Sequence, residues 1–286
     1  MIPASFAYDR PATLGEAFGL LGAHPDAKVI AGGQSLLPLL KLRLASASRL
    51  VDVGRISELR EISRATTGGL AVGALTTYRE LLENPATRVY RCLAEAVVDI
   101  GDVQVRNRGT IGGSIAHADP ASDMPAVLLA LDATFVARSA TGERRISAGD
   151  FFRGPFETAL RTGEILTSIE LPAASGEIGS SYRKLAQPAS GYSIVGVAAV
   201  VGRSGGSISL ARIGITGVGD IAHRASAVES ALIGSDGSAT AIAAAAAHAV
   251  DGQVVASDIH ADRTYRAAMA AIYVRRAIEG ALAALG

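Results

Sequence analysis

The order of strand-like and helix-like segments in the last part of the chain constrains its fold more than any other feature. Three strand-like segments follow one another with no helix between them, at residues 182–185, 194–201 and 207–215. The stretch Gly202–Gly206 between the last two is typical of a hairpin. Alanine-rich segments at Ser238–Val250 and Thr264–Leu285 then predict two helices. Because strands run together before the helices, we predict an α+β fold rather than a regular βαβ alternation.

Composition narrows the class of protein. The chain has 286 residues, of which 49% are hydrophobic, so it can bury a substantial core. Its 27 basic and 27 acidic residues cancel, which argues against a broad basic surface for nucleic acid. The longest apolar stretches, such as Ala241–Ala247, are too short to span a bilayer. The beginning, MIPASFAYDRP, lacks the basic and apolar regions of a secretion signal, so we expect a cytoplasmic protein.

Cysteine and histidine usage limits the chemistry. Cys92 is the only cysteine, which excludes both an internal disulfide and a cysteine-ligated iron–sulfur cluster within this chain. Its helical surroundings favour a small buried apolar residue over a nucleophile. The five histidines form no ligand pair at helical spacing, and the sequence has no GxSxG or GxxxxGK[ST] motif. Redox chemistry would therefore require an organic cofactor.

The chain divides into three sections, which we place at residues 1–55, 56–175 and 176–286. In the first section, Thr13 and Glu16 have the spacing of a capping box for a helix over Thr13–Leu21. A β-like segment, an apolar segment and a strand are expected next, at residues 28–30, 36–44 and 49–53.

The middle section mixes both kinds of element. Strands are predicted at residues 70–73, 135–137 and 165–171. Helices are predicted from Thr76 or Thr77 onward, over 88–100, and over 125–131 with Pro125 in the first turn. Residues 103–109 give no clear pattern. The small residues of Pro172–Ser181 predict a linker to the third section.

Two segments with paired glycines are candidates for binding a phosphorylated ligand. They are Ala31–Ser35 and Thr110–Ser114, and we expect both to be loops. Consecutive backbone N–H groups can surround a pyrophosphate, and glycine allows a close approach. The hydroxyls of Ser35, Thr110 and Ser114 could add hydrogen bonds. Spacing alone leaves an ordinary pair of structural turns equally open.

A third glycine pattern has another interpretation. Gly217–Ala222 matches GxGxxA and lies between a strand-like segment and a helix expected near His223. No second strand ending in an acidic residue follows, because the chain enters Gly234–Ser238 and then an alanine-rich helix. We therefore interpret Gly217 and Gly219 as parts of a strand-to-helix turn.

The sequence closely resembles the FAD-binding medium subunits of the molybdenum hydroxylases, the family of xanthine dehydrogenase and carbon monoxide dehydrogenase. The resemblance runs from end to end. It is carried by MIPASFAYDRPATLGEA, AGGQSLLPLLKLRLA, TIGGSIAHADPASDMPAVLLAL, GEILTSIELP and YRKLAQPASGYSIVGVAAVV.

The resemblance implies an FAD-binding fold of the vanillyl-alcohol-oxidase/MurB (PCMH) type, followed by a C-terminal α+β domain with a three-stranded sheet and helices. It places the FAD diphosphate between the two glycine segments, and it implies no catalytic residue and no metal ligand in this chain. The cofactor-binding residues that it implies are Ile30, Ala31, Gly32, Gly33, Gln34, Ser35, Leu36, Ile100, Thr110, Ile111, Gly112, Gly113, Ser114, Asp123, Leu166, Lys184 and Tyr192.

Five of these residues have individual expectations. Asp123 matches an aspartate beside the flavin and its ribityl chain, although it could also cap the next helix. Leu166 matches a residue that packs near the flavin ring. Lys184 matches a lysine close to the flavin, where a cation would favour negative charge on the reduced ring. Ile100 and Tyr192 match positions that flank the ring, and Tyr192 could equally be a core or edge aromatic.

The resemblance also implies partners. A large molybdopterin subunit would oxidise the substrate and a small subunit would carry two [2Fe–2S] clusters, often as (αβγ)2. This chain would take electrons from those clusters and pass them through FAD to an external acceptor. Carbon monoxide dehydrogenases have histidine at the position of Gln34 and differ over Gln187–Gly191. Both departures count against carbon monoxide as the substrate, but not against FAD binding.

Two other functions are compatible with the residues. One is a free-standing FAD-dependent oxidoreductase of the same fold that acts directly on a small molecule, although 286 residues leave little room for a substrate domain. The other is a non-enzymatic nucleotide-binding module, against which the intact glycine segments argue.

Overall fold

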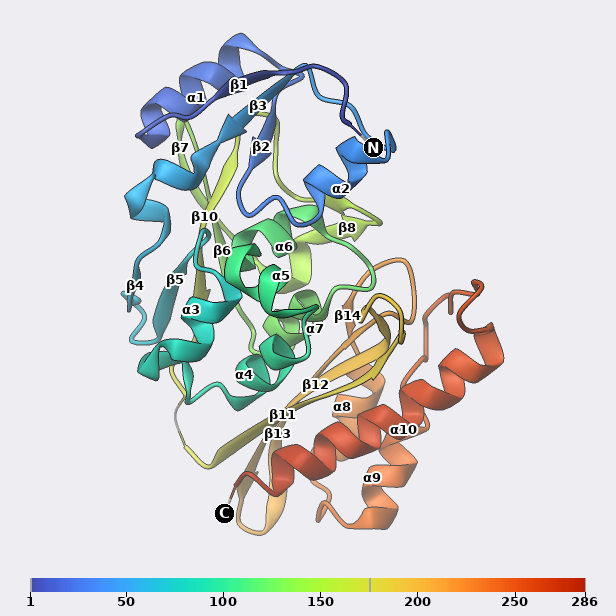
Figure 1. The fold of residues 1–286 in the computed structure, drawn as a ribbon. Helices are drawn as coiled ribbons and strands as arrows, with labels where there is room; N and C mark the ends of the chain where they lie inside the picture. The colour runs from blue at the N-terminus through green and yellow to red at the C-terminus, as the bar shows by residue number, and fades with distance from the viewer. Residues whose placement is uncertain (1, 175, 286) are drawn as a thin grey trace.

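A computed structural model describes residues 2–174 and 176–285. Its strands form sheets of three, five and four strands and a small two-stranded ribbon. Figure 1 shows the three larger sheets following one another from the N-terminus to the C-terminus. This mixture of sheets and helices confirms the α+β class. Residues 1, 175 and 286, which bound the predicted sections, lie outside the described residues.

The first sheet is parallel and has the order β1-β3-β2. Its elements are β1 (Ala7–Asp9), α1 (Leu14–Ala23), β2 (Lys28–Ile30), α2 (Leu36–Lys41) and β3 (Arg49–Asp52). The predicted strands at 28–30 and 49–53 are confirmed within one residue. Thr13 caps α1, but the carboxylate of Glu16 accepts a hydrogen bond from the amide of Ala12 at 2.7 Å, one residue earlier than in the predicted capping box.

The second sheet is antiparallel and has the order β4-β5-β10-β6-β7. Its strands are β4 (Ile62–Arg64), β5 (Leu70–Gly73), β6 (Thr134–Ser139), β7 (Gly142–Ser147) and β10 (Ile165–Leu171). The ribbon is β8 (Phe152–Gly154) and β9 (Glu157–Thr158). Short 3-10 helices lie in connections at Val53–Arg55, Ser57–Leu59, Pro85–Thr87 and Ala148–Asp150. The three strands predicted in this section are confirmed.

Five helices belong to this middle section. They are α3 (Tyr78–Glu83), α4 (Arg91–Val98), α5 (Val103–Arg108), α6 (Ile111–His117) and α7 (Asp123–Ala130). A capping box of Thr77 and Glu80 begins α3. Cys92 on α4 is fully buried, which confirms its interpretation as a core residue, and burial raises the pKa of its thiol to about 12.

The expected loop at Thr110–Ser114 is wrong, because this segment forms the beginning of α6. Thr110 caps the helix by accepting a hydrogen bond from the amide of Gly113 at 3.1 Å. A Cβ atom at Gly112 would lie 2.4 Å from the Cβ atom of Ala74. Glycine is therefore required there for close packing against Ala74, the residue after β5, not for a turn.

The C-terminal sheet has four strands, not the expected three. Its antiparallel order is β11 (Ile178–Ala186), β12 (Ser193–Ser204), β13 (Ser207–Thr216) and β14 (His223–Arg224). The fourth strand occupies the position where a helix was expected, and α8 (Ser226–Leu232) begins three residues later. The linker is also shorter than predicted, because its last residues belong to β11. Helices α9 (Ala239–Ala246) and α10 (Arg263–Leu282) confirm the two alanine-rich predictions.

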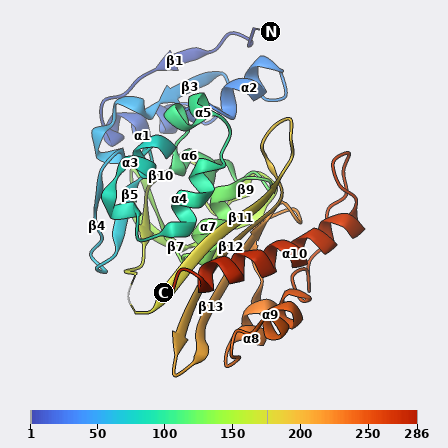
Figure 2. The same cartoon turned by 60° about the horizontal axis from the view of Figure 1, so that its bottom comes forward.

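Strand β12 is buried on both faces of this sheet. Ala198 and Val200 join the core that contains α4 and α7, whereas Val197, Ala199 and Val201 join the core beneath α10. Alternating side chains of one strand point to opposite faces, so β12 joins the C-terminal section to the middle one. In Figure 2, α10 crosses this sheet. No helix among the described residues is long and apolar enough to cross a membrane.

Candidate functional site

A cavity of about 540 Å³ lies where the three sections meet. The turn between β2 and α2, the beginning of α6 and the connection between β11 and β12 all contribute to its wall. Most of the candidate residues line it: Ile30, Ala31, Gly32, Gly33, Gln34, Ser35, Leu36, Ile100, Thr110, Gly112, Gly113, Ser114, Asp123, Leu166 and Tyr192. Ile111 does not, because its side chain is fully buried in the core, and Lys184 lies behind the wall.

The first glycine segment presents a row of free backbone donors to the cavity. Within residues 2–174 and 176–285, the amides of Gly32, Gly33, Gln34 and Ser35 donate no hydrogen bond. Gly33 has a φ of +75°, which only glycine adopts at little cost. Consecutive unpaired N–H groups around such a residue suit an anion with several acceptor oxygens.

Gly32 brings the two glycine segments together. A Cβ atom at this position would lie 2.0 Å from the carbonyl oxygen of Arg108, at the end of α5. No side chain fits in that space. The backbone of the first segment can therefore lie directly against the residues that precede α6.

The second glycine segment contributes packing and hydroxyls rather than free amides. Its successive amides, from Ile111 to Ser114, donate to the oxygens of Thr76, Ala74 and Thr110. The hydroxyl of Ser114 lies 2.8 Å from that of Ser122. The expectation that both segments offer rows of free N–H groups is thus wrong for the second one, because oxygens of Ala74, Thr76 and Thr110 already accept hydrogen bonds from its amides.

Several residues that the sequence did not single out also line the cavity. Burial raises the pKa of Tyr78, and the hydroxyl of Ser114 opposes this shift. The ring of His117 packs against that of Phe156 with 5.1 Å between centroids. Burial lowers the pKa of His117, and Asp119 opposes this. No periodic pattern marks Tyr78 or Phe156, whereas His117 lies within TIGGSIAHADPASDMP, which could have marked it.

The connection between β11 and β12 closes one side of the cavity. Tyr192 lies there with 43% of its surface exposed, and its phenol is close to the hydroxyl of Ser35. Burial is the main cause that raises the pKa of Tyr192. Ile100, which follows α4, lines the same cavity. The arrangement leaves a slot with an aromatic residue and an aliphatic residue in its wall.

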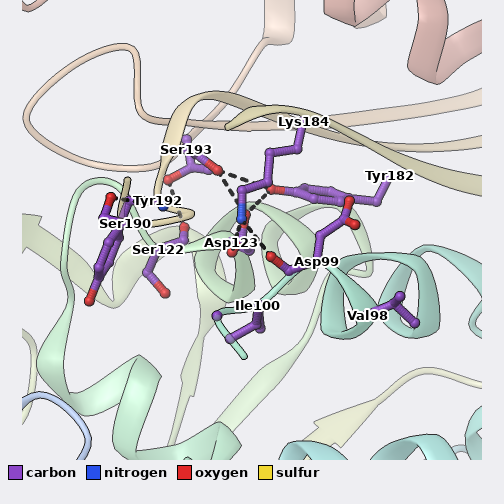
Figure 3. A network of polar contacts seen from close by, with 12 residues as sticks. Val98, Asp99, Ile100, Ser122, Asp123, Tyr182, Lys184, Ser190, Tyr192 and Ser193 are labelled. Carbon is purple, nitrogen blue, oxygen red and sulfur yellow. Dashed lines mark hydrogen bonds and ion pairs between the residues drawn. The ribbon is translucent and has the colours of Figure 1, made fainter. Parts of the chain in front are cut away.

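A buried polar network surrounds Asp123, which lines the cavity (Figure 3). Its Oδ1 atom accepts hydrogen bonds from the hydroxyl of Tyr182 and, at 2.7 Å, from that of Ser193. Its Oδ2 atom lies 2.9 Å from the Nζ atom of Lys184. That ammonium also donates to the backbone oxygen of Asp99 at 3.0 Å. The carboxylate at the beginning of α7 is therefore fully hydrogen-bonded by other elements.

Burial and the neighbouring groups shift the pKa of Asp123 in opposite directions. Burial raises the pKa of Asp123, while the charge of Lys184 and the hydrogen bonds from Tyr182 and Ser193 act in the other direction. Burial, followed by the neighbouring Asp123, raises the pKa of Tyr182 well above its ordinary value, so this phenol stays a donor. Lys184 lines a separate surface groove together with Asp99 and Tyr182.

The residues of the cavity fit a flavin nucleotide. The four free amides match the acceptor oxygens of a diphosphate, and the apolar side chains of Ile100 and Leu166 suit a flat ring system. The volume lies within the roughly 300–1,000 Å³ of cofactor and ligand pockets. Among the described residues, no group of three or more His, Cys, Asp or Glu side chains could hold a metal ion.

Comparison with known families agrees with this geometry. Residues 4–174 match the family described as the FAD binding domain in molybdopterin dehydrogenase. Residues 180–281 match the CO dehydrogenase flavoprotein C-terminal domain. The chain belongs to the FAD-binding medium subunits of the molybdenum hydroxylase family. It is thus a flavoprotein subunit of an oxidoreductase, with the FAD-binding fold that the sequence predicted.

Relatives of this family share nearly the whole chain. The carbon monoxide dehydrogenase medium chain of Hydrogenophaga pseudoflava is 40% identical over 285 residues, which cover 99% of each chain. The glyceraldehyde dehydrogenase medium chain of Sulfolobus acidocaldarius is 41% identical and covers 82% of this chain and 83% of its own. Since similar identities occur in relatives with different substrates, similarity of the medium subunit does not identify the substrate of a complex.

Solved structures show the same fold. The carbon monoxide dehydrogenase structure from Hydrogenophaga pseudoflava has a chain with a TM-score of 0.95 and 42% identity, covering 99% of both chains. Quinoline 2-oxidoreductase from Pseudomonas putida 86 has one with a TM-score of 0.92 and 37% identity, covering all of both chains.

Proposed function

We propose that this chain is the electron-transfer subunit of a molybdenum-containing hydroxylase or dehydrogenase. It would take electrons from [2Fe–2S] clusters of a small subunit, while a large molybdopterin subunit oxidises the substrate. The cavity with free amides at Gly32–Ser35 carries the proposal, because it offers an anion site next to an apolar slot. We place this assembly in the cytoplasm, with (αβγ)2 stoichiometry and an external electron acceptor.

The residues of the cavity would divide the work of holding FAD. The amides of Gly32–Ser35 would bind the diphosphate, and Thr110 and Ser114 line the same cavity. Ile100, Leu166 and Tyr192 would surround the ring. When bound, FAD supplies the exchange of electrons between one-electron and two-electron carriers. The chain itself would position the ring and exclude solvent, with no general acid or base.

Purification of the complex tests this proposal. The chain, co-expressed with a molybdopterin subunit and an iron–sulfur subunit, should carry flavin that bleaches when the substrate of the complex is added. The isolated chain with FAD should show no bleaching by the same substrate, because the substrate site belongs to another chain. Substrate turnover by the isolated chain with a dye acceptor would contradict the proposal and favour a free-standing oxidoreductase.

A further inference from the structure

The side chain of Lys184 does not line the cavity, but it contacts Asp123, which does. The cavity wall contains Asp123 but not Lys184, whose side chain is 2% exposed and faces a separate groove. The Nζ atom lies 2.9 Å from the Oδ2 atom of Asp123. Residues 61 positions apart thus form one buried ion pair (Figure 3), of which only the negative partner lines the cavity.

The environment of this pair makes its charges effective. The side chain of Asp123 is 7% exposed, so little water surrounds the two groups. Charges in such surroundings are poorly screened by solvent and salt. Tyr182 and Ser193 hold the carboxylate from the other side, which leaves it no freedom to turn away. A change in either charge would therefore change the electrostatic potential in the cavity.

We propose that Lys184 and Asp123 act on the bound cofactor as one neutral ion pair, so that Lys184 sets the reduction potential of the cofactor through Asp123 and not as a free positive charge. The inference rests on the proposed FAD site. Reduction adds negative charge to a cofactor, which a nearby cation favours and a nearby anion opposes. In a close pair these two effects largely cancel.

The proposal predicts opposite effects of the two single substitutions. Lys184→Met leaves the carboxylate of Asp123 without its cation, and the potential of the bound flavin should fall. Asp123→Asn leaves the ammonium without its anion, and the potential should rise. The double variant Asp123→Asn/Lys184→Met restores neutrality and should return close to the wild-type potential. A lysine acting as a free charge would instead give a low potential in both Lys184 variants.

The pH dependence adds a second readout. In Lys184→Met, burial favours the protonated carboxyl of Asp123, so its charge disappears as the pH falls. The loss of potential relative to wild type should therefore be largest at high pH and shrink at low pH. The titratable or charged groups that face Asp123 are Tyr78 on α3, Asp99 after α4, Tyr182 and Lys184 on β11, and Tyr192 before β12. The pKa values of the three tyrosines are all raised, so these phenols stay neutral over that range.

The experiment is a redox titration of the full-length chain loaded with FAD, followed by flavin absorbance. It compares wild type, the two single variants and the double variant, with Lys41→Met as the control that removes an exposed lysine at the end of α2. Opposite shifts in the single variants, with recovery in the double variant, would support the proposal.

Four results would overturn it. Equal potentials in all variants would show that the pair has no influence on the cofactor. Equal lowering in both Lys184 variants, or loss of flavin from all three variants, would show that Lys184 acts by itself or that the side chains matter only for folding. A wild-type chain that binds no FAD would overturn this inference together with the proposed function.

Discussion

Adjacent glycines at the candidate FAD site are required for different physical reasons. Gly32 has no room for a Cβ atom, because the carbonyl oxygen of Arg108 would lie 2.0 Å from it. Gly33 has a φ of +75°, where other residues are strained. Gly112, in the second segment, is needed for packing against Ala74. The two glycine segments are thus similar in sequence but differ in local structure. The first is a row of free amides, and the second is the first turn of a helix.

Gly32→Ala should reduce both stability and FAD retention. The added methyl group must push the first segment away from Arg108, at a cost of about 1–3 kcal/mol for an overpacked site. The flavin-to-protein ratio and the melting temperature measure the two effects. Gly19→Ala is the matched control, because a Cβ atom there meets nothing within 4 Å and lies on α1. Gly32→Ala with full flavin content would contradict the proposed contact.

The buried ring of His223 should make the stability of the folded chain depend on pH. Both ring nitrogens are buried, and neither has a hydrogen-bond partner within the described ranges. Burial lowers the pKa of His223, opposed by the backbone of Ile221. The unfolded chain then binds a proton at a pKa of about 6.5 while the folded chain resists it. Stability contributed by the neutral ring is therefore complete above about pH 6.5 and is lost as the pH falls below it.

His223→Leu should flatten that dependence. The free energy of unfolding from urea titrations should fall less between pH 7 and 5, a range set by the ordinary histidine pKa of about 6.5, than it does for wild type. The exposed His248 supplies the control, His248→Leu. An unchanged slope for His223→Leu would show that the buried ring does not titrate on unfolding.

At the scale of elements, Arg266 fixes the long helix α10 to the sheet. Its side chain is 3% exposed and donates to the backbone oxygens of Ile194 at 2.8 Å and Gly217 at 2.6 Å. It also pairs with Asp258 at 2.8 Å. These bonds join the beginning of α10 to the beginning of β12 and to the turn after β13, near the connection that carries Tyr192.

Arg266→Met should lower the free energy of unfolding by about 2–3 kcal/mol, because two buried carbonyl groups lose a charged donor. Arg275→Met, which removes only an exposed pair with Glu279 on the same helix, should change it by at most about 0.5 kcal/mol. Equal effects of the two substitutions, in a denaturant titration, would show that the buried contacts contribute little.

Elements with strong local patterns could be predicted from the sequence. Strand Ile165–Leu171 can be predicted with both ends correct, because its apolar residues lie between the turn at Gly163 and Pro172. Helix α5 cannot be predicted, since VQVRNR has no apolar periodicity and no buried residue. The two-residue strand His223–Arg224 is shaped by pairing with β13, a tertiary contact that local propensity does not carry.

In the candidate site too, some features could be predicted from the sequence and others could not. The glycine segments can be found by their composition, and the family resemblance adds Asp123, Lys184 and Tyr192. The pairing of Lys184 with Asp123 could not be predicted, because it depends on how the C-terminal sheet packs against α7. The backbone partners of the second glycine segment likewise depend on how the residues after β5 lie against α6.

At the scale of the whole molecule, the cavity exists only because three sections meet. The first supplies the free amides, the second supplies α6 and Asp123, and the third supplies Tyr192 and the donors that hold Asp123. Since each wall comes from a different section, we expect FAD binding to stabilise the whole chain, by about 2.7 kcal/mol when free FAD reaches 100 times its dissociation constant.

That coupling predicts a rise in the unfolding temperature on adding FAD, measured by calorimetry as a single transition that moves as a whole. Adenosine alone, which lacks the diphosphate, should give a smaller rise because it leaves the amides of Gly32–Ser35 unpaired. A transition that splits on adding FAD, with only part of the chain stabilised, would contradict a site shared by all three sections.

A crystal structure of the chain with FAD would locate the cofactor. We expect the diphosphate within hydrogen-bonding distance of the amides of Gly32–Ser35, with the flavin ring between Ile100 and Tyr192. A diphosphate bound to the amides of α6 instead, or FAD located outside this cavity, would contradict this expectation.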